Sequence, residues 1–318
     1  MLRPYLDLVR VQLTPTAVAD SFAGYCLAVV ARHSPPSAGT AATLAVTSIC
    51  AYWMGMATND LLDLEKDRRH QAPRPLVRGQ LGSGRGWIFA CLLAAGALAA
   101  ALSISTDAAL GASAVMATAL IYNAGGKRVP IAGNLLMGSC RAGNLVLGAL
   151  GAVSIRELAY DKELGYEVLA GAGILGLYIA GVTSVSVLED SPPGPIPILV
   201  TTVPLLIVPV VLVTPAWPGP WAIANSVVLA ALILRALFRA AREAAAQASG
   251  APSGAGPPGR RPHPAGQFVR SGLRGLFLVD AGVLLARDPR EVWGPVVVLY
   301  GLMILAWLWP RHWLQSFE

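Results

Sequence analysis

The sequence has 318 residues, of which 55% are hydrophobic and 13% are charged, and its mean hydropathy is +0.58. Soluble domains carry about 25% charged residues, so this composition excludes an ordinary water-soluble protein. The net charge of +6 would suggest a nucleic-acid partner for a soluble chain. Here the Lys and Arg residues gather in particular loops, as membrane topology produces, so we expect a lipid bilayer and no nucleic acid as partner.

Apolar runs that are long enough to cross a bilayer, about 17–25 residues each, recur along the whole chain. They lie at residues 13–31, 40–58, 87–104, 108–124, 133–153, 165–187, 197–213, 221–241, 268–286 and 292–309. The pattern predicts an all-α polytopic membrane protein with nine to ten transmembrane helices. It also predicts a single membrane domain over residues 1–318.

The loops between these runs differ in charge. Lys and Arg are concentrated in alternate loops, above all in residues 59–86, whereas loops 105–107 and 214–220 contain none. Basic loops stay on the cytoplasmic side, so both termini are predicted to be cytoplasmic. Residues 246–266 are rich in Gly, Pro, Ser and Ala, a composition typical of a flexible linker.

A row made of Asn59, Asp60, Asp63 and Asp67 stands at the expected cytoplasmic end of the second run, in the stretch Thr58-Asn-Asp-Leu-Leu-Asp-Leu-Glu-Lys-Asp67. If the helix continues, Asn59, Asp63 and Asp67 follow one another at intervals of four and share one face. A row of carboxylates repels itself unless a cation is bound. Mg²⁺ fits, because it takes one or two carboxylates together with water and phosphate oxygens. The alternative is a solvated helix end, since basic residues follow directly.

A loop stiffened by proline comes next, Ala72-Pro-Arg-Pro-Leu-Val-Arg-Gly-Gln-Leu81. Its residues Arg74 and Arg78 bring two guanidinium groups beside the carboxylates, and arginine binds phosphate in a bidentate manner. Acid row and arginine loop together indicate a site for Mg²⁺ and a diphosphate.

These two segments resemble the UbiA superfamily of intramembrane prenyltransferases, which has an Asn-Asp-x-x-Asp-x-x-x-Asp row followed by an Arg-Pro-Leu-x-x-Gly loop. The matching residues are Asn59, Asp60, Asp63, Asp67, Arg74, Pro75, Leu76 and Gly79. The resemblance implies that Asn59, Asp63 and Asp67 bind Mg²⁺ and diphosphate. We count Asp60 among the metal ligands, and Asp63 and Asp67 among the catalytic residues. The resemblance to this superfamily also implies that the helices are bundled around a central cavity.

The stretch Tyr122-Asn-Ala-Gly-Gly-Lys-Arg128 closes the fourth run and is similar to the family's tyrosine followed by a basic residue. The resemblance implies that Tyr122, Lys127 and Arg128 contribute to the diphosphate site. Lys127 is the preferred counter-ion and a catalytic candidate. An anchoring role at the membrane surface is the alternative, above all for Arg128.

Arg141 and Asn144 lie one turn apart inside the fifth run. A charge in mid-span is costly, so Arg141 is expected to face a cavity and to bind the diphosphate or an acidic partner such as Glu189. A purely structural ion pair is the alternative. The surrounding Gly-x-Cys-Arg-x-x-Asn pattern resembles a divergent UbiA branch associated with bacterial Ebo gene clusters, which implies a bacterial cytoplasmic membrane.

The sequence departs from the family at its second acidic motif. The three acids of that motif align with Thr183, Ser186 and Asp190, so hydroxyl groups replace two of them. Hydroxyls are neutral and weaker Mg²⁺ ligands. Glu189 and Asp190 remain as candidate ligands of a second ion, and a site with one ion is the alternative.

Two further acids, Asp20 and Asp280, lie inside predicted spans. Each is a candidate for function or for pairing with an interior arginine such as Arg10 or Arg274.

The resemblance implies an enzyme that uses Mg²⁺ to transfer a prenyl group from an allylic prenyl diphosphate to a small acceptor. A terpene cyclase of the same superfamily is an alternative within the enzymes. A multi-pass transporter or lipid carrier is the alternative from another class. Prenyl length, acceptor and oligomeric state are not determined by these patterns.

Overall fold

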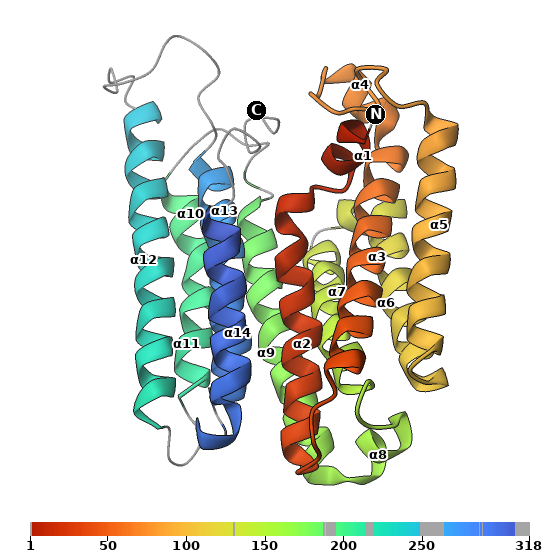
Figure 1. Cartoon of the computed structure of the whole chain (residues 1–318). Helices are drawn as coiled ribbons and strands as arrows, with labels where there is room; N and C mark the ends of the chain where they lie inside the picture. Colours follow the sequence, from red (N-terminus) through yellow and green to blue (C-terminus); the bar gives the residue numbers. More distant parts are fainter. Residues whose placement is uncertain are drawn as a thin grey trace.

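The computed structural model describes residues 2–129, 131–186, 188, 195–213, 219–248, 264–285, 287 and 289–308. Within these ranges the chain is helical and contains no strand (Figure 1). Five helices in the described part are long and apolar enough to cross a membrane. They span Val11–Ala31, Ala38–Leu62, Ser83–Leu102, Lys162–Ser186 and Pro220–Gln247.

The helices follow one another along the chain with short connections. They are α1 (Arg3–Leu8), η1 (Val11–Leu13), α2 (Thr14–Ala31), α3 (Ala38–Leu62), α4 (Leu64–Arg69), α5 (Ser83–Leu102), α6 (Thr106–Ala124), η2 (Gly126–Arg128), α7 (Ala132–Ala149), α8 (Ile155–Tyr160), α9 (Lys162–Ser186), α10 (Pro195–Thr202), η4 (Val203–Leu206), α11 (Ile207–Val211), α12 (Pro220–Ala248), α13 (Pro264–Leu285) and α14 (Pro289–Leu308). Every predicted apolar run coincides with helical residues. The run 197–213 is divided by the 3₁₀ turn η4.

The short helices α1 and α8 fall in segments where no helix was predicted, whereas α4 lies where the helix of the second run was expected to continue. Helix α8 begins with a capping box, in which Ser154 and Glu157 each bind the other's backbone N–H. Such a box satisfies two amide groups that a helix start leaves without partners. At the opposite end of the molecule, α1 and α4 lie beside each other (Figure 1).

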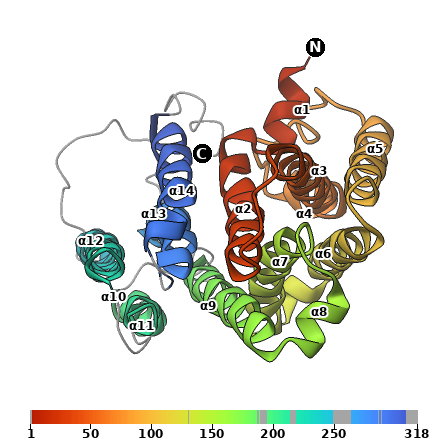
Figure 2. The ribbon, with the colours of Figure 1, turned by 60° about the horizontal axis from the view of Figure 1, so that its bottom comes forward.

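Helix α2 is the central element of the fold. Most of its residues are buried, and it contacts α3 and α7 on one side and α13 and α14 on the other (Figure 2). One continuous apolar core surrounds it and includes side chains from both sides. Helix α2 thus joins the N-terminal helices, which hold the acid row, to the C-terminal ones.

The contact between α2 and α7 depends on two glycines. A Cβ atom on Gly24 would collide with the carbonyl group of Leu145, and one on Gly148 would collide with the carbonyl group of Ser21. Small residues allow such close approach of helix backbones, which is a common way of packing helices in membranes.

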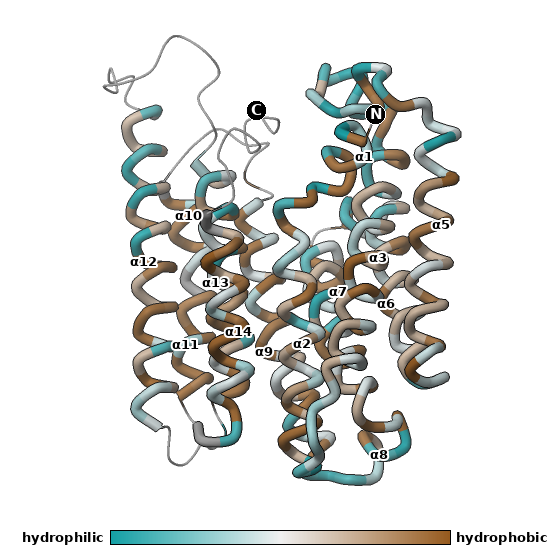
Figure 3. The backbone as a smooth tube through the Cα atoms, viewed as in Figure 1, coloured by the Kyte–Doolittle hydropathy of each residue, from teal (hydrophilic) through white to brown (hydrophobic). Residues whose placement is uncertain are grey.

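Hydropathy is distributed as expected for a protein in a bilayer. Apolar residues dominate the middle of the helices, whereas polar residues gather around α1, α4 and α8 and near the C-terminal end of α12 (Figure 3). Large apolar side chains such as Ile88, Leu92 and Leu169 are exposed on the outer surface. Exposed apolar area of this extent suits contact with lipid.

Candidate active site at the end of the bundle

The acid row lies where α3 passes into α4. Helix α3 ends at Leu62, yet the Asp63 amide donates to the Asn59 carbonyl over 3.0 Å and the Asp67 amide donates to the Asp63 carbonyl over 2.8 Å. The first bond belongs to the end of α3 and the second to the start of α4, so the two helices are separated at Asp63. The expected continuous helix is therefore two successive helices.

Lys127 brings a positive charge to this row. Its ammonium group donates to the Asn59 side-chain oxygen over 2.8 Å and forms an ion pair with the Asp63 carboxylate. The 3₁₀ turn η2 carries Lys127, and a Cβ on Gly133 would approach Lys127 Cα to 2.9 Å, so glycine is needed to seat this turn against α7. Arg128, the next residue, is exposed.

Asp60 points to the buried side of the same helix end. Its side chain is only 1% exposed, and it accepts from Arg10 Nη2 at 2.9 Å and pairs with Arg74 Nη1 at 3.3 Å. The Asn59 amide adds a third donor at 3.2 Å. Asp60 thus anchors two arginines, an arrangement that differs from the metal-ligand role expected from the sequence.

Arg10 is the site residue that sequence reasoning missed. We considered it only as a partner for Asp20, whereas it pairs with Asp60. Its backbone has φ of +49°, a left-handed conformation that is uncommon for residues other than glycine. This turn between α1 and η1 directs the side chain toward α3. The available signal was its position just before the first apolar run, a place that a basic residue shares with the acid row if both lie on the same side of the membrane.

Asp67 shares Arg74 with Asp60, at 3.8 Å from Arg74 Nε. Burial raises the pKa of the Asp67 carboxyl above its ordinary value, and the Asp60 and Asp63 carboxylates act in the same direction while Arg74 opposes them. Burial likewise lowers the pKa of the Arg74 guanidinium, and Arg10 adds to this effect. Burial and the neighbouring carboxylates therefore both disfavour the ionised form of Asp67, an effect that a cation bound beside it would offset.

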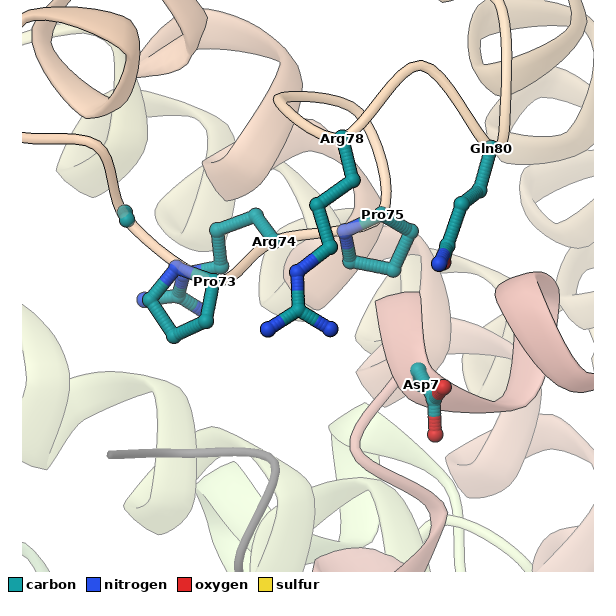
Figure 4. Close-up of a pocket in the computed structure, with 7 residues that line it drawn as sticks. Asp7, Pro73, Arg74, Pro75, Arg78 and Gln80 are labelled. Atoms are coloured by element: carbon teal, nitrogen blue, oxygen red, sulfur yellow. The ribbon is translucent and has the colours of Figure 1, made fainter.

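A polar pocket of about 130 Å³ opens beside the row. Figure 4 shows Arg78 in its centre, between the Pro73 and Pro75 loop and Asp7 on α1. Arg74 and Gln80 also line it. The pocket brings the two loop arginines together, as the sequence predicted, at a place where an anion from solvent can reach them.

A second cavity of about 90 Å³ lies within the N-terminal helices. It is mostly apolar, with Tyr122, Arg141 and Asn144 among its lining residues. Gly55 and Met56 also line it and lie on α3 one turn before Asn59. The cavity therefore extends from the acid row toward the interior of the bundle.

Arg141 lines this cavity, as expected, but its positive charge is already balanced by an ion pair. It forms an ion pair with Asp20 at 2.9 Å and donates to the Thr16 carbonyl over 2.8 Å. Asn144 donates to the Ala17 carbonyl and accepts from Ser48 over 2.6 Å. The acidic partner of Arg141 is thus Asp20 within the described residues, and the expected pairing of Asp20 with Arg10 or Arg274 is not what the structure contains.

The second motif offers few free ligands. The Thr183 hydroxyl donates to the Ile179 carbonyl over 2.8 Å, and the Ser186 hydroxyl donates to the Thr183 carbonyl over 2.7 Å. Both groups are used within α9. Glu189 and Asp190, the other expected ligands, lie outside the described residues.

The oxygen groups of the row suit Mg²⁺. In the described part of the chain, no three His, Cys, Asp or Glu side chains converge as in a metal site made of protein alone. Mg²⁺ does not need such a cage, because water and phosphate oxygens complete its octahedron. The Lys127 ammonium lies between the Asn59 oxygen and the Asp63 carboxylate, so this position already favours a cation.

The family model described as UbiA prenyltransferase family matches residues 21–190, which is more than half of the chain. The chain belongs to the UbiA prenyltransferase family. With its apolar helices, this membership makes it an integral membrane protein. No curated protein sequence matches the chain significantly.

Solved UbiA structures share the fold. A UbiA homolog from Aeropyrum pernix K1 in its apo form has 20% identity and a TM-score of 0.63, covering 85% of this chain and 96% of that one. A UbiA homolog from Archaeoglobus fulgidus bound to DMAPP and Mg²⁺ has 15% identity and a TM-score of 0.56, covering 87% and 99%. A digeranylgeranylglyceryl phosphate synthase has 18% identity and a TM-score of 0.57, covering 93% and 99%.

Proposed function

We propose that this UbiA family member is an enzyme that uses Mg²⁺ to transfer a prenyl group from an allylic prenyl diphosphate to a small acceptor within the membrane. The family supports the reaction class. The Archaeoglobus fulgidus homolog was solved with DMAPP and with GPP, each together with Mg²⁺, which supports the substrate class.

The observation that carries this proposal is the arrangement of three cations around the acid row. Lys127 bridges Asn59 and Asp63, and Arg10 and Arg74 converge on Asp60. The cations balance the acids in the absence of substrate. A diphosphate adds negative charge, and Lys127 and Arg74 lie close enough to the row to turn from carboxylates to phosphate oxygens.

In this scheme Asn59, Asp63 and Asp67 hold Mg²⁺, while Asp60 keeps Arg10 and Arg74 in place. Mg²⁺ supplies charge neutralisation of the diphosphate as the carbon–oxygen bond breaks.

Further positive groups surround the diphosphate position. Lys127, Arg74 and Arg78 stabilise the departing diphosphate, with Tyr122 and Arg128 at its edge. Arg141 and Asn144 shape the apolar cavity below, in which the prenyl chain is kept from water.

We also propose that every predicted apolar run crosses the bilayer and that the acid row faces the cytoplasm. The excess of Lys and Arg in loop 59–86 supports this orientation. The whole chain then forms one membrane domain. A reporter fused at residue 70 should indicate the cytoplasm, and an external signal there would contradict the orientation.

The test of the function is product analysis. Purified protein in detergent receives Mg²⁺ and allylic diphosphates of several lengths, and released diphosphate and organic products are measured by mass spectrometry. The Asp63→Asn variant serves as the control, because it removes a proposed ligand at the half-exposed end of the bundle. We expect diphosphate release with the native chain and strong loss with the variant.

The organic product separates the remaining alternatives. A prenylated acceptor supports the transferase. A cyclic hydrocarbon or alcohol made from the diphosphate alone would identify a terpene cyclase. Binding without release of diphosphate, for all chain lengths, would contradict both enzymes and favour a carrier.

A further inference from the structure

Two buried acids meet in the centre of the bundle, away from the acid row. Asp20 on α2 and Asp280 on α13 are both 0% exposed. The two carboxyl groups are close enough to interact directly. This cluster joins α2, which the family model includes in large part, to a helix beyond the matched range.

The positive charge in this cluster is insufficient for two carboxylates. Arg141 forms an ion pair with Asp20, and Asn144 donates to Asp20 over 3.4 Å. The charged groups that act on either acid, within the described residues, are the other acid and Arg141. If both acids were ionised, the dry centre would carry one uncompensated negative charge.

The hydrogen bonds of Asp280 indicate the same deficit. Neither of its carboxyl oxygens receives a hydrogen bond from a donor in the described part of the chain. An ionised carboxylate that is buried without donors is strongly disfavoured, and the usual response is to take up a proton. A protonated Asp280 would donate to the Asp20 carboxylate, while Arg141 balances the charge that remains.

We propose that Asp20 and Asp280 together bind one proton at neutral pH, forming a carboxyl–carboxylate pair beside Arg141 that ties α13 to α2 and α7. The proton is shared between two acceptors that would otherwise repel each other. This site is separate from the acid row, because no contact between its three members and the row occurs in the described residues, although Arg141 also lines the cavity proposed for the prenyl chain.

Infrared spectroscopy tests this proposal directly. The native protein in detergent at neutral pH should give the carbonyl band of a protonated carboxyl group that exchanges slowly with D₂O. The band should be lost in Asp280→Asn. It should also be lost in Asp20→Asn, where the single remaining acid ionises beside Arg141. Glu157→Gln changes an acid at the end of the bundle and should leave the band intact.

Thermal stability supplies a second measurement. Asparagine at position 280 can donate to Asp20 as the protonated acid does, so Asp280→Asn should shift the unfolding temperature by less than about 3 °C. Asp280→Glu lengthens a side chain without space and serves as the packing control; it should lower the unfolding temperature more.

Three results would overturn the proposal. The first is a native spectrum with no protonated carboxyl band, and the second is a band that both Asp variants retain. The third is an unfolding temperature that depends on the Na⁺ concentration in the native protein but not in Asp280→Asn. That result would mean that a metal cation, and not a proton, is bound between Asp20 and Asp280. If Asp280→Asn does not fold, the spectrum of Asp20→Asn decides.

Discussion

The molecule contains two clusters of acids that solve the same electrostatic problem in different ways. At the end of the bundle, Asp60, Asp63 and Asp67 are matched by Arg10, Arg74 and Lys127. In the centre, Asp20 and Asp280 share Arg141 as their one cation among the described residues. The first cluster borders solvent through Arg74, whose side chain is 30% exposed, and each of its acids has a cation nearby, which suits the binding of a charged ligand. The second is dry and has one cation too few, which suits a fixed structural role.

The largest expected effect comes from breaking the central cluster. Arg141→Gln removes the only cation in the described part of the chain that acts on the two buried acids. Removal of one partner from a buried ion pair costs about 3–5 kcal/mol. We expect a corresponding loss of stability in denaturant or thermal unfolding of the protein in detergent. Normal stability together with weakened diphosphate binding would instead return Arg141 to the substrate role first considered for it.

The matched change at the end of the bundle is Lys127→Met. The side chains of Lys127 and Asp63 keep 17% and 15% of their surface exposed, so loss of this ion pair should lower stability less than Arg141→Gln, whose partner Asp20 is 0% exposed. Loss of one donor to a developing negative charge reduces turnover by about 10²–10³-fold. Measurement of diphosphate release and of unfolding on the same sample separates the two effects. If Lys127→Met unfolds easily but releases diphosphate at the normal rate when folded, the acid row has a structural role like that of the central cluster, which would contradict this prediction.

Asp60→Asn should reduce diphosphate binding by less than Lys127→Met reduces turnover. The variant leaves Arg10 and Arg74 without their shared carboxylate, and hydrogen bonds to charged groups contribute about 1.5–3 kcal/mol. We expect reduced stability and displaced arginines, measured as weaker binding of inorganic diphosphate by calorimetry. Mg²⁺ binding that is lost while diphosphate binding stays normal would restore Asp60 to the metal ligands.

The smallest effect concerns an acid outside both clusters. Hydrogen bonds from the Ser154 backbone and hydroxyl lower the pKa of Glu157 below its ordinary value. A lowered carboxyl pKa adds stability above the unfolded-state value, and this stability is lost as pH falls through the folded value. Glu157→Gln should therefore reduce stability by about 0.5 kcal/mol at neutral pH, with the difference vanishing in acid. Unfolding curves at several pH values check this.

The sequence predicted the helices well because apolar run length is a local property. Each run coincides with helical residues, including those of α2 and α9. The short helices α1 and α8 were missed because they are too short to produce an apolar run, and α4 was expected only as a continuation of the preceding helix. The number of runs that cross the membrane stays a prediction.

The site was predictable only as far as it is encoded in neighbouring residues. The spacing of Asn59, Asp63 and Asp67 did not reveal the break at Asp63 between α3 and α4, and the role of these residues as ligands stays a prediction. Pairings between distant segments were not encoded in this way. Arg10 lies 50 positions from Asp60 in sequence, and the meeting of Asp20 with Asp280 depends on how α13 packs against α2. Such contacts follow from tertiary packing, which no local pattern contains.

The glycine contact between α2 and α7 has a consequence for motion. Where Gly24 and Gly148 meet the partner helix, main-chain atoms touch without side chains between them. Such contact prevents the two helices from sliding past each other, so we expect α2 and α7 to move as one rigid pair. An opening that admits a substrate would then bend the turns that connect this helix pair to the rest of the chain. One such turn is the left-handed one at Arg10 before η1, and the other is the turn at Gly125, with φ of +154°, before Lys127. These turns hold Arg10 and Lys127, two cations of the acid row, so we expect movement of the helix pair to change the distance between the Arg10 guanidinium and the Lys127 ammonium.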